Sequence, residues 1–139
     1  MPVAHFHLPA DTYTAEQEAQ LLRRAAAEYA RILNSPIDRT RVYVVHYAAS
    51  SIAVAGELCS DSGVIAPYFT AIVLAGRPAE QRHELLAGFT ELLVNVLGVD
   101  RSVVRGQIIE VSPENWGIAG GPASVARATE IAQRAGELH

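Results

Sequence analysis

The second half of this chain repeats the first. The segment TAEQEAQLLRRAAAEYARILN, which starts at Thr14, resembles PAEQRHELLAGFTELLVNVLG, which starts at Pro78, and their Ala-Glu-Gln triplets lie 64 residues apart. The same offset relates Arg41 to Arg105, and it relates the segment IAVAG to the segment WGIAG. A repeat of this kind means that one supersecondary unit is built twice. The fold must therefore combine two equivalent units.

Each repeat is predicted to fold as a strand, a helix and a second strand. VAHFHL, directly after Pro2, alternates between two sets of side chains as a half-buried strand does. The next segment has apolar residues at helical spacing, and Thr14 with Gln17 forms a capping box at its start. RVYVVHY is rich in β-branched and aromatic residues and is predicted to be the returning strand. The second half repeats this pattern with YFTAIVL, a helix with Pro78 at its first position, and VVRGQIIEV.

Two such units predict an α+β fold, in which tandem β-α-β repeats form a four-stranded mixed sheet with two helices on one face. We expect a single domain over residues 1–139, with the repeats at 2–66 and 67–121. Residues 122–139 show only a weak helical pattern and are predicted to be a C-terminal extension. The other sheet face carries apolar and aromatic side chains, so we expect self-association to cover it.

The composition excludes several classes of function. The net charge is −4 and there is no basic run, so nucleic acid is not an expected partner. No apolar run approaches the roughly 20 residues of a membrane span, so no membrane is expected either. The lone Cys59 excludes an internal disulfide and favours a cytoplasmic location. All 11 basic residues are arginine, so amine chemistry can come only from the N-terminus.

The joint pattern resembles the tautomerase superfamily: a β-α-β repeat with an N-terminal proline, a Gly-Arg-x-x-x-Gln segment and a Gly-rich turn after the second strand. AGRPAEQRHELL through SVVRGQIIEVSPENWGIAGG is similar to a whole subunit of 4-oxalocrotonate tautomerase, and PVAHFHL through IAVAGEL is similar to another copy. The fused arrangement resembles the malonate semialdehyde decarboxylase and cis-3-chloroacrylic acid dehalogenase branches. The resemblance covers about residues 2–121. It implies a tautomerase fold, a homotrimer and a small carboxylate substrate.

The resemblance also implies that an N-terminal proline acts as general base, general acid or electrophile. Removal of Met1 would make Pro2 a terminal secondary amine, whereas a retained Met1 would block it. A cationic neighbour and an apolar pocket would lower the pKa of this amine, as a general base near neutral pH requires. The alternative is a proline that only starts a strand. Pro67 matches Pro2 in the repeat but lies inside the chain, so we expect one proline site per chain.

Further site residues follow from the same resemblance. Arg77, at the Gly-Arg position of the second half, would bind the substrate carboxylate in a bidentate fork, whereas the first half has Thr12 or Tyr13 there. Arg105 and Arg41 match the second-strand arginine that polarises a substrate oxo group, and a structural ion pair is the alternative for each.

The remaining matches and departures separate the branches of the superfamily. Trp116 matches the aromatic residue that lines the pocket, and a core or interface tryptophan is the alternative. Asp38, in PIDR, resembles the Asp-Arg pair of the decarboxylase branch, and Tyr13 could donate a hydrogen bond in the pocket. Three residues that equip the dehalogenases for hydrolysis have no counterpart here. Their positions are held by Ile118, Tyr29 and Gln107.

These residues favour tautomerisation of a small 2-oxo or enol carboxylate. Decarboxylation of a 3-oxo acid, or hydration or dehalogenation of a small unsaturated acid, is the alternative at the same site. A catalytically silent trimeric scaffold or binding protein is an alternative of another class. No cofactor is implied. His5 and His7 lie on one strand face without a third ligand at suitable spacing, so no metal is expected.

Overall fold

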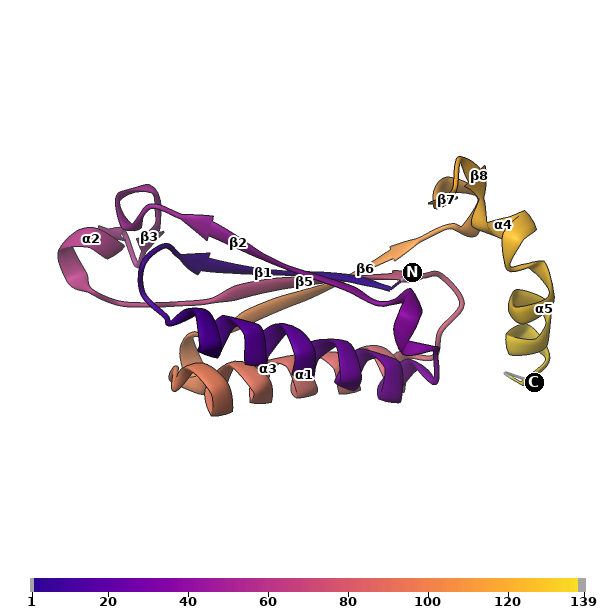
Figure 1. The fold of residues 1–139 in the computed structure, drawn as a ribbon, viewed down its shortest axis with the longest axis horizontal. Helices are drawn as coiled ribbons and strands as arrows, with labels where there is room; N and C mark the ends of the chain where they lie inside the picture. The colour runs from indigo at the N-terminus through magenta and orange to yellow at the C-terminus, as the bar shows by residue number, and fades with distance from the viewer. Residues whose placement is uncertain (1, 138–139) are drawn as a thin grey trace.

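The computed structural model describes residues 2–137, which form two β-α-β units joined in one sheet (Figure 1). The first unit consists of β1 (Val3–Pro9), α1 (Ala15–Leu33) and β2 (Arg41–Tyr47), and the second of β5 (Tyr68–Leu74), α3 (Ala79–Leu97) and β6 (Arg105–Val111). The strand order is β2-β1-β5-β6, parallel within each unit and antiparallel between β1 and β5. Both long helices cover the same face of the sheet. The predicted α+β fold with a four-stranded mixed sheet is confirmed.

The antiparallel β1–β5 pair puts the two prolines at opposite ends of the sheet. Val3 pairs with Ile72, near the end of β5, so Pro2 lies where the second unit turns away from the sheet. The two ends have the same local geometry. The carbonyl of Pro2 accepts a hydrogen bond from the Arg41 amide at 3.0 Å, and that of Pro67 accepts one from the Arg105 amide at 3.1 Å. We call these the Pro2 end and the Pro67 end.

A short hairpin rises above the sheet at each end (Figure 1). The Pro67 end carries η2 (Ala49–Ser51), β3 (Ala53–Val54), β4 (Glu57–Leu58) and α2 (Cys59–Ser62). The Pro2 end carries η4 (Pro113–Asn115), β7 (Gly117–Ile118), β8 (Gly121–Pro122), α4 (Ala123–Ala126) and α5 (Ala128–Glu137). The strands β2 and β6 are preceded by η1 (Ile37–Arg39) and η3 (Arg101–Val103). The expected extension 122–139 thus includes two helices, and its last two residues lie outside the described part.

The core is built from aromatic side chains between the sheet and the helices. Phe89 of α3 packs against Phe6 and Phe69 of the central strands, with ring centroids 5.4 and 5.6 Å apart. Tyr29 of α1 meets Phe89 edge to face at 5.1 Å. Its buried hydroxyl lies within hydrogen-bond distance of the carbonyls of Val3 (3.1 Å) and Ile72 (2.9 Å). Burial therefore raises the pKa of Tyr29 and keeps it neutral. Tyr29 ties α1 to the strand pair beside Pro2.

Gly106 of β6 is required for the core to pack. The ring of Phe69 lies directly over it, and a Cβ at position 106 would be 2.1 Å from Cζ of that ring. We expect Gly106→Ala to lower the free energy of unfolding by about 1–3 kcal/mol or more, because the buried ring must leave its place. Gly117→Ala is the control, since its Cβ would meet nothing within 4 Å. Equal urea midpoints for the two variants would contradict this packing.

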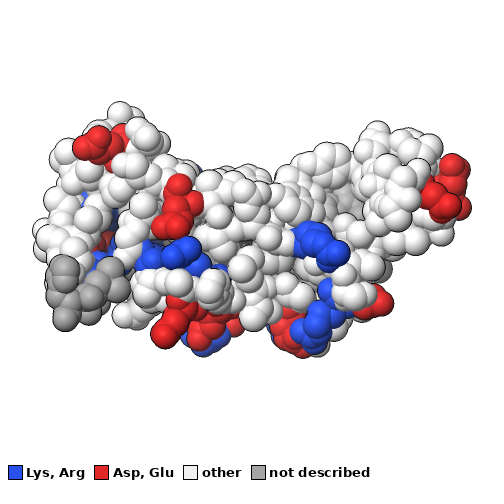
Figure 2. Space-filling model, turned by 180° about the vertical axis from the view of Figure 1, so that it is seen from behind, with Lys and Arg blue, Asp and Glu red and all other residues white. Residues whose placement is uncertain are grey.

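The open face of the sheet is lined by stacked polar aromatic rings. His5 stacks on Tyr43, and His7 stacks on Tyr68 and lies 2.7 Å from the Tyr47 hydroxyl. Partial burial, followed by repulsion from His5, lowers the pKa of His7. Figure 2 shows a hollow, mostly uncharged surface between the two raised ends. No three His, Cys, Asp or Glu side chains within residues 2–136 gather as a metal site, and no helix in the described part of the chain is both long and apolar enough to cross a bilayer.

Candidate functional site

Pro2 is buried at the start of β1 and lines a small cavity at its end of the sheet. The charged side chains around this cavity are four arginines and one carboxylate: Arg39, Arg77, Arg127, Arg134 and Glu130. Leu33, Val73 and Leu74 supply apolar surface. The cavity therefore combines Pro2, three apolar side chains and an excess of positive charge. The cavity itself holds only about 20 Å³, so a ligand would reach it from the larger space beside it, where the excess of positive charge suits an anion.

Arg77 reaches this cavity from the turn that follows β5. Gly76 adopts a φ of +110°, which a residue with a side chain rarely adopts, and this turns the chain toward α3. The Arg77 Nη1 donates to the carbonyl of Leu33 at 2.8 Å and to Oε1 of Gln81 at 3.2 Å. Burial, and secondly repulsion from Arg134, lowers the pKa of Arg77 to about 10. Among the described residues no carboxylate forms an ion pair with Arg77, so its charge is available to a ligand.

Arg39 is held by the C-terminal helix. Its two terminal nitrogens bind the two carboxylate oxygens of Glu130 at 2.7 and 2.9 Å, a bidentate pair between η1 and α5. This hydrogen-bonded pair raises the pKa of Arg39 and lowers that of Glu130. The pair fixes α5 against the Pro2 end.

A second cavity of about 360 Å³ adjoins the first and shares Arg39 and Arg127 with it. It is lined by Asp38, Arg41 and Trp116, three residues that the sequence singled out. Asp38 and Arg41 are exposed and Trp116 is half-buried. The structure thus brings five predicted site residues to one end of the sheet. They are Pro2, Asp38, Arg41, Arg77 and Trp116.

The other two predicted residues, Arg105 and Tyr13, lie at the Pro67 end. The Arg105 Nη1 donates to the carbonyls of Ser102 (2.8 Å) and Val104 (2.9 Å) beside its own strand. The Tyr13 hydroxyl is buried and has no hydrogen-bond partner within the part of the chain described. Burial, and secondly Cys59, raises the pKa of Tyr13. Within one chain, neither residue contributes to the Pro2 cavity.

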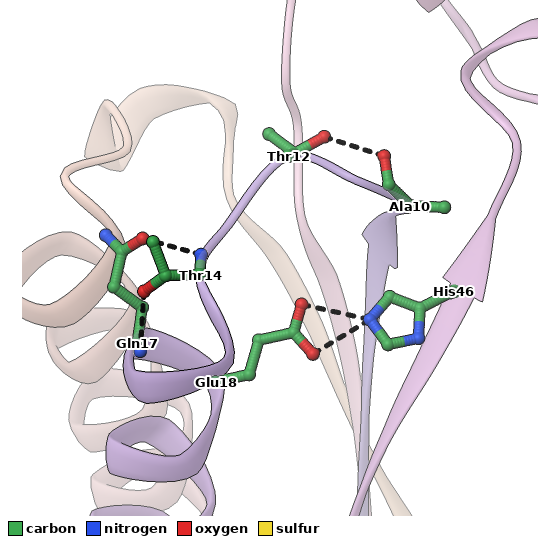
Figure 3. A network of polar contacts seen from close by, with 6 residues as sticks. All are labelled: Ala10, Thr12, Thr14, Gln17, Glu18 and His46. Carbon is green, nitrogen blue, oxygen red and sulfur yellow. Dashed lines mark hydrogen bonds and ion pairs between the residues drawn. The ribbon is translucent and has the colours of Figure 1, made fainter.

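The turn after β1 shows what the first repeat has in place of Arg77. Thr12 donates from its hydroxyl to the carbonyl of Ala10 at 3.1 Å, so its side chain only closes the turn (Figure 3). Thr14 and Gln17 form the predicted capping box, and Glu18 binds His46 at 2.8 Å (Figure 3). This turn therefore offers no guanidinium to the Pro67 end.

Sequence reasoning did not identify Arg127, Glu130 and Arg134 as site residues, and it indicated Arg39 only as the second member of the Asp-Arg pair in PIDR. A weak signal was present, because Arg127 and Arg134 are seven residues apart and lie on one side of a helical pattern. No local sequence feature indicated that the helix formed by this segment would pack beside Pro2.

Known proteins share both the repeat and the fold. A profile of the family described as "Tautomerase enzyme" matches residues 2–62 and again residues 67–126. The chain is 39% identical over 54 residues to the 2-hydroxymuconate tautomerase of Comamonas testosteroni, covering 39% of this chain and 86% of that protein. It is 47% identical over 45 residues to "Probable tautomerase K2" of Dickeya dadantii, covering 32% of this chain and 67% of the relative.

The solved structure titled "Native Fused 4-OT" superposes with a TM-score of 0.82 at 26% identity, covering 88% of this chain and 97% of that one. A fused 4-OT described as a symmetric trimer superposes with a TM-score of 0.80 at 23% identity, covering 89% and 98% of the two chains, and shows the same fold. This chain belongs to the tautomerase family. It is a tautomerase-like enzyme whose two repeats are arranged as in a fused 4-OT.

Proposed function

We propose that this enzyme interconverts the keto and enol forms of a small 2-oxo or enol carboxylate, with Pro2 as the general acid and base. The observation that carries the proposal is that Pro2 and Arg77, from different repeats, line one cavity with an excess of positive charge. A buried amine beside guanidinium groups has a lowered pKa, because both burial and positive charge disfavour its ammonium form. This leaves a neutral amine available near pH 7.

In the proposed reaction, the Pro2 nitrogen takes the hydroxyl proton of the enol as the C=O bond forms. It then returns that proton to the conjugated carbon, so that no other reactant is needed. Arg77 binds the substrate carboxylate, and Arg41 stabilises the charge that develops on the enolate oxygen. Trp116 lines the adjoining cavity, and its indole ring would exclude water from the bound substrate. Arg105 and Tyr13 would act at Pro2 only from a neighbouring copy of the chain.

We also propose that the enzyme is a homotrimer. Its open sheet face carries exposed Tyr43, Tyr47 and Tyr68 on a hollow surface with little charge (Figure 2), which a neighbouring copy would cover. Several solved fused 4-OT structures with this fold are described as trimers. Sedimentation equilibrium at micromolar concentration is expected to give three times the chain mass. A stable monomer would contradict the proposal.

Decarboxylation of a 3-oxo acid is the second candidate for the same site. Asp38 supports it, because its carboxylate lines the adjoining cavity beside Arg39 and Arg41, as an Asp-Arg pair would. In that reaction a cationic Pro2 would polarise the carbonyl while carbon dioxide leaves, and would then give its proton to the carbon of the resulting enolate.

The experiment measures turnover of phenylenolpyruvate, 2-hydroxymuconate and malonate semialdehyde by protein whose N-terminus has been checked by mass. The proposal requires a free Pro2 amine, and Met1 lies outside the described residues. We expect the enol acids to be ketonised by protein without Met1. Protein with a residue inserted between Met1 and Pro2, so that the methionine stays attached, is expected to be inactive.

Turnover of malonate semialdehyde alone would favour the decarboxylase. Full activity with the methionine attached would refute the role of Pro2, and no turnover of any compound would favour a silent scaffold.

A further inference from the structure

We propose that the C-terminal helix α5 is part of the ligand-binding site. In this proposal Arg134 binds an anionic group of the ligand together with Arg77, and the Glu130–Arg39 pair positions the helix for this task. The inference rests on the proposed function only in taking the Pro2 cavity as the reaction site. The tautomerase profile ends at residue 126, two residues before α5 begins, so the matched part of the family does not include this helix.

The first argument is the shape of the Pro2 end. α5 stands beside the ends of α1 and α3 rather than against the sheet (Figure 1). A cleft of about 540 Å³ lies between it and those helices, which is the size of a small-molecule site. The cleft adjoins the Pro2 cavity. They share Leu33, Ser35, Arg39, Arg77, Glu130 and Arg134.

The second argument is charge. Both carboxylate oxygens of Glu130 accept hydrogen bonds from Arg39, as described above. This leaves Arg77, Arg127 and Arg134 around the cavity, and none of them forms an ion pair with a carboxylate among the described side chains of residues 2–136. Arg134 is close enough to Arg77 that their repulsion contributes to the lowered pKa of Arg77. An anion between the two guanidinium groups would relieve this repulsion and accept hydrogen bonds from both.

The third argument is the position of α5. The Glu130–Arg39 pair joins residues 91 positions apart and is partly buried, with side-chain exposures of 39% and 27%. Arg134 follows Glu130 by one helical turn, so the same face of α5 carries both the ion pair and the proposed ligand contact. Figure 2, seen from behind, shows blue side chains set into the surface at this end of the molecule.

The test uses malonate, an unreactive dicarboxylate, and measures its dissociation constant by titration calorimetry with the full chain. Arg134→Gln is expected to raise Kd for malonate about ten- to a hundredfold, the effect of losing one charged hydrogen bond. The control is Arg101→Gln, which removes the same charge from the Pro67 end, where Arg101 pairs with Glu91. It should leave Kd unchanged.

The effect of Glu130→Gln on malonate affinity distinguishes a positioning role of Glu130 from a simple effect of its charge. Glu130→Gln makes the cavity more positive, which by itself would tighten malonate binding. If the Glu130–Arg39 pair holds Arg134 in place, this variant instead binds malonate more weakly, and the exchange Arg39→Glu with Glu130→Arg restores part of the affinity. Tighter binding by Glu130→Gln, or wild-type binding by Arg134→Gln, would overturn the proposal.

Kinetics give an independent readout. Arg134→Gln is expected to raise KM for phenylenolpyruvate while kcat changes little, because Arg134 binds the carboxylate and does not transfer the proton. A loss confined to kcat would contradict this role. Malonate binding requires no turnover, so it tests α5 even if the enzyme fails to ketonise phenylenolpyruvate. The two proposals can therefore fail separately.

Discussion

Replacement of Pro2 by alanine is expected to lower kcat/KM for phenylenolpyruvate by about 10²–10⁴-fold, the usual contribution of one general acid–base group. Alanine leaves a primary amine at the N-terminus. It loses the pyrrolidine ring that holds the nitrogen, and with it the fixed direction of the amine lone pair. The amine would still titrate, so we expect a small residual activity. Stopped-flow absorbance at the enol band measures both rates.

Pro67→Ala is the matched control for this substitution. Pro67 is buried like Pro2, starts the equivalent strand and accepts the equivalent hydrogen bond from Arg105. It has no free amine, so its replacement should leave kcat/KM unchanged even if stability falls. Similar losses for the two variants would show that the prolines serve the fold and that Pro2 is not the proton carrier.

Replacement of Arg77 by alanine is expected to lower kcat/KM about ten- to a hundredfold, because one charged hydrogen bond contributes roughly 1.5–3 kcal/mol. Thr12→Ala is the control, since Thr12 lies in the equivalent turn of the first repeat and its hydroxyl donates a hydrogen bond to the carbonyl of Ala10. Arg77 also donates to the Leu33 carbonyl, so the rates should be compared well below the melting temperature of each variant. Equal effects at both positions would refute the proposed division between the repeats.

The pH profile gives a second test of Arg77. Its pKa of about 10 is lowered by burial, so its charge is present below pH 10 and is lost above it. Since kcat/KM reports the free enzyme, we expect it to fall as the pH rises through about 10. The fall should be absent in Arg77→Ala. A profile that stays flat to pH 11 in the wild type would contradict the assignment.

The fold could be predicted from the sequence because its determinants are local and occur twice. The alternation of VAHFHL, the capping box at Thr14 and the apolar stripes of the helices each specify an element. The repeat then limits how the elements combine. The closeness of Arg77 to Pro2 was implied by the resemblance to the tautomerase superfamily and not by any local pattern.

The environment of the site depends on contacts that no local pattern encodes. Arg39 and Glu130 meet across 91 positions, and their pairing depends on how α4 turns the chain after the second hairpin. Arg41 and Arg105 are equivalent in the repeat, yet the antiparallel central pair carries them to opposite ends. A repeat identifies equivalent residues, but only the strand register shows which of them share a cavity.

The covalent joining of the two β-α-β units has an evolutionary consequence. In a symmetric pair of separate, identical units, one mutation in the gene would change both ends of the sheet. In this chain the residues of the Pro2 end and of the Pro67 end are encoded by different codons, which can mutate independently. Selection can therefore alter the turn at Thr12 or the buried hydroxyl of Tyr13 without changing Arg77. The Pro67 end is free to diverge while the proposed proton transfer at Pro2 is preserved.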